Sequence, residues 1–228
     1  MKKRIIGIDV ARALAVIGMI IVNFKIAFGQ TGSELMKSFA GLFEGKAAAT
    51  FVVLAGVGIA LMSNSAIKNL DSIKFRKIQI RLAKKSIFLF VVGLLYIPIW
   101  SADILHFYGV YMIITLLLLK SSGKVIITTS LILILVYPFL LSIWNFDIGW
   151  DFETFEYANF WSLNGFIRNL FYNGFHPVIP WVSFMLIGFW FGKQDLYNPK
   201  FIKKNYLDKF KHFYCNIASI SILNFITI

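Results

Sequence analysis

The sequence predicts an all-α fold: a polytopic bundle of transmembrane helices, about six full spans plus a partial seventh, with the N-terminus in the cytoplasm. Three observations predict this class. Hydrophobic residues make up 58% of the 228 residues, against about 45–50% in a soluble domain. They fall in runs close to the ~20 residues that a helix needs to cross a bilayer. Basic residues gather between these runs, as they do in cytoplasmic loops.

The apolar runs give the expected spans, and the whole chain, 1–228, is expected to form a single integral membrane domain. The spans cover residues 8–28, 46–63, 86–100, 102–119, 125–145 and 177–192. A seventh run begins near residue 213 and reaches Ile228, which is shorter than a full span. The domain is therefore expected to be incomplete at its C-terminus. Small residues such as Gly56 and Ala60 would let the second span approach a neighbouring helix closely.

The distribution of lysine and arginine predicts the orientation. Eighteen of these residues lie in segments that would face the cytoplasm, and four lie in segments that would face outside. Such a bias places the N-terminus inside. Residues 64–85 are then a basic cytoplasmic loop, and residues 146–176 an extracytoplasmic loop. The second loop is expected to contain an interfacial amphipathic helix, carried by Leu163, Phe166, Leu170 and Phe171.

Composition narrows the classes of partner. The net charge of +12 would suggest nucleic-acid binding in a soluble protein, but here the cytoplasmic loops account for it. No nucleic-acid partner is expected, whereas the lipid bilayer is, and a homo-oligomer is left open. Cys215 is the only cysteine and the three histidines lie on distant segments, so no metal site is expected. The excess of lysine over arginine fits an AT-rich bacterial genome, and the expected location is the bacterial plasma membrane.

One expected span opens with an acid and a histidine three residues apart, Asp103 and His106. Residues at this spacing share a face of a helix. An ionisable pair at membrane depth is costly unless it faces protein or water, so it is a candidate functional site. The acid would orient the ring and stabilise its cation, as in general-base catalysis. The alternative is a hydrogen bond that only ties helices together.

Other polar residues form two groups. At the inner end of the first span, Asp9 and Arg12 share a face; they form either a structural ion pair or a cytoplasmic site in which Arg12 contacts an anion. At the outer ends of several spans, polar residues fall at similar depth, which predicts a shared outward-facing pocket. These residues are Asn23, Lys25, Glu44, Lys46, Asp103, His106 and His176. His176 precedes Pro177 and, taken alone, also fits a helix-capping or interfacial role, with Trp181 at the interface.

Four stretches resemble one known family. They are GIDVARALAVIGMIIVNF, FEGKAAATFVVLAGVGIALM, ADILHFYGVYMIITLLLL and FYNGFHPVIPWVSFMLIGFWFGKQDL. Together they resemble the bacterial membrane proteins related to heparan-alpha-glucosaminide N-acetyltransferase, within the wider transmembrane acyltransferase superfamily. The resemblance is spread over residues 4–196.

This resemblance implies acyl transfer across the membrane: acetyl-CoA is used from the cytoplasmic side and the acyl group reaches an acceptor, often a sugar, on the other side. The family uses a histidine between its first helices, and residues 29–46 contain none. His106, His176 and Asp103 are therefore the expected catalytic residues here. Family members have about ten or eleven spans, so the chain would lack the C-terminal third.

The resemblance thus implies a membrane acyltransferase that uses acetyl-CoA and modifies an extracytoplasmic glycan or a small hydroxyl or amine acceptor. The donor phosphates would contact Arg12, Arg76, Lys77 and Arg81. The acceptor would contact Asn23, Glu44, Lys46 and Arg168. Two alternatives stay open: a multi-span transporter or exporter, in which the same polar groups line a path, and a truncated, non-catalytic membrane homologue.

Overall fold

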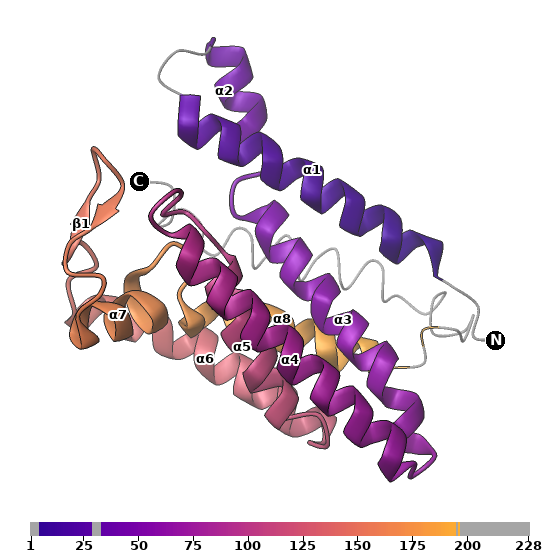
Figure 1. Cartoon of the computed structure of the whole chain (residues 1–228). Helices are drawn as coiled ribbons and strands as arrows, with labels where there is room; N and C mark the ends of the chain where they lie inside the picture. Colours follow the sequence, from indigo (N-terminus) through magenta and orange to yellow (C-terminus); the bar gives the residue numbers. More distant parts are fainter. Residues whose placement is uncertain (1–4, 29–32, 195, 197–228) are drawn as a thin grey trace. The chain divides into compact units, whose positions relative to one another are not determined.

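The computed structural model describes residues 5–28, 33–194 and 196, and these residues are mainly helical (Figure 1). They form two compact units that divide within one helix, between Ala55 and Gly56. Each unit has its own packing and is described separately.

The first unit contains α1 (Ile6–Phe28), α2 (Glu34–Gly41) and the first part of α3 (Lys46–Lys68). The side chain of Ser33 caps α2 by accepting a hydrogen bond from the backbone N–H of Met36. Gly18 on α1 allows a close helix contact, because a Cβ there would lie 2.9 Å from the Cβ of Ala47. Small residues therefore bring α1 and α3 together, as they do in other membrane helix pairs.

The second unit holds the rest of α3 and all later elements. These are α4 (Ser72–Tyr96), α5 (Leu105–Leu117), α6 (Gly123–Ile143), β1 (Trp150–Asp151), β2 (Glu156–Tyr157), α7 (Leu163–Arg168), the π-helical turn η1 (Asn169–Asn173) and α8 (Val178–Gly192). Helix α5 lies along α4 and also contacts α8, which in turn packs against α6 (Figure 1). The short strands β1 and β2 pair antiparallel.

Helix α8 forms the centre of the second unit, and most of its residues are buried. Gly56 is the point of closest approach to it, because a Cβ at Gly56 would lie only 2.0 Å from the backbone oxygen of Met185. About one turn further along α3, Ala60 approaches Gly192 of α8, because a Cβ at Gly192 would lie 2.7 Å from the Cβ of Ala60. The close approach predicted from Gly56 and Ala60 is thus confirmed, and its partner is α8.

Three helical stretches of the described residues are long and apolar enough to cross a membrane: Ile6–Phe28, Glu34–Lys68 and Gly123–Ile143. A further pair, Leu163–Asn173 and Val178–Gly192, passes the same test as one span bent by 47° at a short break. The prediction of an all-helical membrane domain agrees with these helices, whereas the count of six spans plus a seventh stays a prediction. The expected seventh run lies outside the described residues.

The third expected span, residues 86–100, overlaps only the second half of a longer helix, α4. Residues 72–85, expected in a cytoplasmic loop, are helical and form the first half of α4. The reason is a good helix start and a buried stripe: Asp71 caps the Lys74 N–H, and the stripe consists of Phe75, Ile78 and Leu82. Helix α4 is too highly charged in this half to count as a fully apolar span.

The segment 146–176 contains the expected helix, preceded by the β1–β2 hairpin. Helix α7 and the turn η1 carry the apolar residues on which the amphipathic prediction rested. Some of these apolar residues are exposed and others are buried: Leu163 is 74% exposed, whereas Leu170 is 5% exposed. This segment leads directly into His176 and the start of α8.

Candidate functional site

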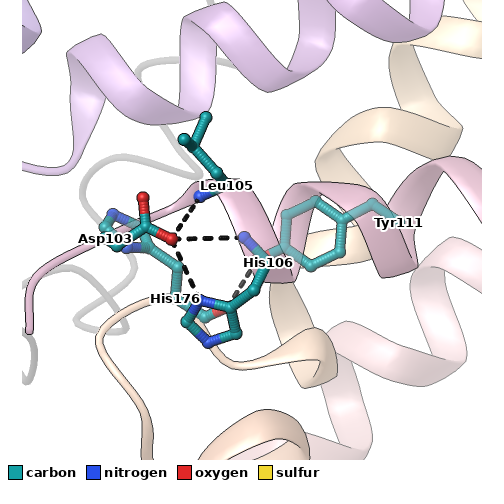
Figure 2. Close-up of polar contacts among 5 residues, drawn as sticks. All are labelled: Asp103, Leu105, His106, Tyr111 and His176. Atoms are coloured by element: carbon teal, nitrogen blue, oxygen red, sulfur yellow. Dashed lines mark hydrogen bonds and ion pairs between the residues drawn. The ribbon is translucent and has the colours of Figure 1, made fainter. Parts of the chain in front are cut away.

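The site is centred on the hydrogen bond between Asp103 and His106. Asp103 lies just before α5 and His106 is in its first turn. The Oδ2 atom of Asp103 accepts from the backbone N–H groups of Leu105 (2.9 Å) and His106 (3.2 Å), and it lies 3.0 Å from the ring Nδ1 of His106 (Figure 2). One carboxylate oxygen therefore both caps the helix and holds the ring. The predicted pair forms within one segment rather than between two helices.

The proton positions on His106 follow from these bonds. Oδ2 already accepts from two backbone N–H groups, so it is an acceptor for the ring as well. Nδ1 then carries the proton, and Nε2 carries the lone pair that a general base needs. His106 is 1% exposed, and its Nε2 atom has no hydrogen-bond partner among the described residues. A buried polar atom without a partner costs about 1–3 kcal/mol, which makes Nε2 a candidate contact for a substrate.

His176 lies beside this pair, in the break between η1 and α8. The hydroxyl of Tyr111, on the same helix as His106, donates to the backbone carbonyl of His176 (Figure 2). The ring of Phe107 lies near both imidazoles, with its centroid 3.8 Å from that of His106 and 6.2 Å from that of His176. The structure thus brings together all three expected catalytic residues.

Two further buried nitrogens in this region lack a hydrogen-bond partner in the described part of the chain: Nδ1 of His176 and Nε1 of Trp181. The two rings lie 4.6 Å apart between centroids, nearly edge to face. Trp181, expected at the membrane interface, is only 1% exposed. It packs inside the second unit because it occupies the first turn of the buried helix α8. The sequence offered no sign that its N–H would be left without a partner.

A hydrogen-bond network holds the segment that precedes His176. Nε of Arg168 donates to the hydroxyl of Tyr157 (2.7 Å), which donates to Oδ1 of Asn173 (2.7 Å). The amide of Asn173 donates to the backbone oxygens of Phe146 and Ile148. Arg168, expected to bind the acceptor, is therefore engaged with a neighbouring side chain. Sequence reasoning missed Asn173; the only sign of it in the sequence was an asparagine three residues before His176.

The expected donor-binding residues of the second unit lie along the first half of α4. Arg76, Lys77 and Arg81 are exposed, and within residues 5–28 and 33–194 none of them has an acidic partner. Gly93, on the same helix, contacts Asp103 and His106. Arg81 precedes Gly93 by twelve residues, which is about 18 Å along a helix. The basic residues and the Asp103–His106 pair therefore lie at opposite ends of α4.

The remaining expected site residues belong to the first unit. Arg12 pairs with Asp9 at 3.6 Å and donates to the backbone oxygen of Leu54 at 3.1 Å, so the predicted ion pair is confirmed. Glu44 pairs with Lys25. The others are Asn23, which is exposed, and Lys46, which begins α3. The shared outer pocket that would join this set to Asp103 and His106 stays a prediction.

The described residues contain no group of three or more histidine, cysteine or acidic side chains arranged to hold a metal ion. The chemistry available at the site is that of an oriented imidazole with a lone pair, a neighbouring indole N–H and a second imidazole. These groups suit proton abstraction and stabilisation of negative charge on oxygen.

Comparison with known protein families gives a match over most of the chain. The family described as heparan-alpha-glucosaminide N-acetyltransferase, catalytic, matches residues 4–222. No curated protein and no solved structure matches the chain. The match covers both units and every residue of the site.

Proposed function

Because the chain belongs to the heparan-alpha-glucosaminide N-acetyltransferase catalytic family, we propose that it transfers an acyl group from acyl-CoA to an acceptor across the membrane. Its apolar helices and its family make it an integral membrane protein of an acetyltransferase-like group. Acetyl-CoA is the proposed donor, taken from the cytoplasmic side. An extracytoplasmic glycan or a small hydroxyl or amine compound is the proposed acceptor, and the bacterial plasma membrane is the proposed location.

The observation that carries this proposal is the buried pair of Asp103 and His106. Its ring is oriented through Nδ1, and Nε2 has no partner in the described chain. In the reaction, Nε2 takes the proton of the acceptor hydroxyl as the oxygen forms a bond to the thioester carbon. The C–S bond then breaks, and the CoA thiolate receives the proton as the thiol. Asp103 stabilises the imidazolium that exists between these steps.

The basic half of α4 supports the donor side of the proposal. Arg76, Lys77 and Arg81 are exposed cations without acidic partners in the described residues, and such groups bind phosphate well. Their distance of about 18 Å or more from Gly93 would be spanned by the extended pantetheine arm of CoA. With the N-terminus inside, as the charge bias predicts, these residues face the cytoplasm. Arg12 is a further proposed donor contact.

The test is transfer of labelled acetyl from acetyl-CoA by the purified protein in liposomes, with a panel of hydroxyl and amine acceptors inside. His106→Ala removes the base, and His106→Asn is the matched variant, because its amide can still donate to Asp103 from near the Nδ1 position. Both are expected to lower transfer by about 10²–10⁴-fold, while His106→Asn keeps the thermal stability of the parent. Full transfer by either variant would remove His106 from the mechanism.

A second experiment separates donor binding from chemistry. Calorimetry with acetyl-CoA in detergent is expected to show weaker binding for the triple variant Arg76→Gln, Lys77→Gln and Arg81→Gln, and for Arg12→Ala. Replacing the exposed Lys124 by Gln tests for a general loss of positive charge and should change binding little. Substrate accumulation in vesicles without CoA would instead favour a transporter and overturn the proposed function.

A further inference from the structure

The indole of Trp181 is a buried donor that nothing in the described chain uses. Trp181 is 1% exposed, and its Nε1 atom has no hydrogen-bond partner among the described residues. Indole Nε1–H is a donor only, and a buried tryptophan usually finds a partner for it. A phenylalanine would avoid the penalty of an unmade hydrogen bond. An unpartnered donor at such a position indicates a group that is supplied from outside the chain.

Trp181 belongs to the same cluster as His106, through a continuous series of ring contacts. His106 touches Phe107, Phe107 lies edge to face against His176, and His176 lies 4.6 Å from Trp181 between centroids. The bond from Tyr111 on α5 to the His176 carbonyl joins the helix of His106 to the segment that starts α8 (Figure 2). The base and the unpartnered donor are therefore held on elements that are fixed to each other.

We propose that the Nε1–H of Trp181 donates a hydrogen bond to the carbonyl oxygen of the acyl group, and that this bond strengthens as the oxygen becomes negatively charged. This inference rests on the proposed acyltransferase function. The reaction itself requires a hydrogen-bond donor at the acyl oxygen. Attack on the thioester carbon moves the C=O π electrons onto this oxygen, and return of those electrons expels the CoA thiolate. Donors already in place at that oxygen stabilise the intermediate.

The choice of the acyl oxygen over the acceptor follows from hydrogen-bond roles. An acceptor hydroxyl must donate its proton to Nε2 of His106, which is the lone-pair atom of the pair. The acyl oxygen has only lone pairs, so it requires a donor, and Trp181 supplies one without any change of protonation. Nδ1 of His176 is also buried and unpartnered in the described residues. In its Nδ1–H tautomer it is the natural second donor to the same oxygen.

The sharpest variant replaces only the N–H. Benzothienylalanine, introduced at position 181 by amber suppression, has sulfur in place of the indole N–H and nearly the same shape. We expect acetyl transfer to fall by about 10²–10³-fold with unchanged thermal stability, since the indole makes no hydrogen bond within the described part of the chain. Trp181→Phe is the simpler second variant and should show the same kinetic loss.

The matched control is Trp150, whose Nε1 donates to the backbone oxygen of Asn173. The same replacement there removes a bond made within the protein. It is expected to lower the melting temperature, because a buried acceptor loses its donor. A stability loss at Trp150 without one at Trp181 would show that the two indoles serve different partners.

A binding measurement tests the inference without catalysis. Acetyl-CoA and S-ethyl-CoA have similar size, but only acetyl-CoA has the carbonyl oxygen. The parent protein should bind acetyl-CoA about three- to tenfold more tightly than S-ethyl-CoA, and the benzothienylalanine variant at 181 should bind both equally. The control variant at Trp150 should keep the preference.

Three outcomes are distinguishable. Loss of the preference and of transfer at position 181, with stability kept, supports the assignment. A preference and transfer rate that survive the replacement overturn the role of Trp181 and leave the proposed acyltransferase function intact. If the parent protein neither binds acetyl-CoA nor transfers acetyl, the proposed function fails, and this inference fails with it.

Discussion

Gly93 on α4 lies directly against Asp103. A Cβ at Gly93 would come within 2.8 Å of Oδ2 of Asp103 and 2.3 Å of the backbone nitrogen of His106. Both distances are shorter than real Cβ atoms tolerate, and the second neighbour is backbone. The absence of a side chain at Gly93 is thus a condition for the position of the hydrogen-bonded pair at the start of α5.

Gly93→Ala is therefore expected to displace the start of α5 and to disturb the bond between Asp103 and His106. Acetyl transfer should fall by at least tenfold, and the melting temperature should drop. Gly7→Ala is the matched control, because a Cβ there meets no atom of the described residues within 4 Å and alanine favours a helix. Unchanged activity in Gly93→Ala would show that the pair tolerates displacement or has no role in transfer.

Asp103 combines a structural and a chemical role, and Asp103→Asn separates them. The amide oxygen of asparagine can still accept from the N–H groups of Leu105 and His106, so the start of α5 should keep its stability. It cannot stabilise an imidazolium as a carboxylate does, so transfer should fall by about 10²–10⁴-fold. Asp103→Ala should lower both the stability of the start of α5 and the rate of transfer. If the two variants lost equal thermal stability, the structural and chemical roles of Asp103 would not be separable in this way.

Arg168 was expected to bind the acceptor, and its bond to Tyr157 offers a direct test. Because Nε of Arg168 donates to the Tyr157 hydroxyl, Arg168→Gln and Tyr157→Phe should each lower stability. The double variant should cost less than the sum of the two, by about 0.5–3 kcal/mol. Denaturation of all three variants gives this coupling energy. A raised KM for the acceptor in Arg168→Gln, absent from Tyr157→Phe, would support the binding role as well.

Gly56 sets the distance between α3 and α8. A methyl group at this position would lie 2.0 Å from the Met185 backbone oxygen, and only movement of a helix relieves such a contact. Gly56→Ala should lower the melting temperature in detergent, although alanine is the better helix former. Gly7→Ala should leave it unchanged or raise it slightly. Equal melting temperatures for the two variants would remove Gly56 from the helix contact.

The β1–β2 hairpin should respond to acid through Asp151. The backbone N–H groups of Glu153 and Thr154, with the Thr154 hydroxyl, hold the pKa of Asp151 below its ordinary value. Since the folded pKa lies below the unfolded one, the carboxylate stabilises the hairpin above the unfolded pKa. This contribution is lost as the pH falls through the folded pKa. Carboxyl NMR titration, assigned with Asp151→Asn, measures it; a pKa at or above the ordinary value would contradict the hydrogen bonds.

The local features of the site were predictable because they depend on neighbours in the sequence. The i, i+3 spacing of Asp103 and His106 is enough to place a carboxylate near an imidazole at the start of a helix, and the bond follows. The spacing of Asp9 and Arg12 gave their ion pair in the same way. The basic half of α4 was also visible as a charged segment, although its helical form depended on the cap at Asp71 and the buried stripe behind it.

Long-range relationships could not be read in this way. Gly93 lies ten residues from Asp103, and nothing in the spacing shows that α4 and α5 approach so closely there. Tryptophan is a residue type typical of membrane interfaces, and only the packing of α8 within the second unit buries Trp181. Arg168 looked free to bind a ligand until the hairpin placed Tyr157 beside it.

By itself, then, the sequence determined that the chain is a helical membrane protein and which acid and histidine form a pair. Hydrophobic run length, charge distribution and helical spacing are properties of short segments, so they can be determined without knowledge of the fold. The tertiary structure alone decided which polar atoms are buried without partners, because burial and hydrogen-bond satisfaction depend on what other segments supply. That is why the base was expected from the sequence, while the indole donor of Trp181 emerged only from the packing.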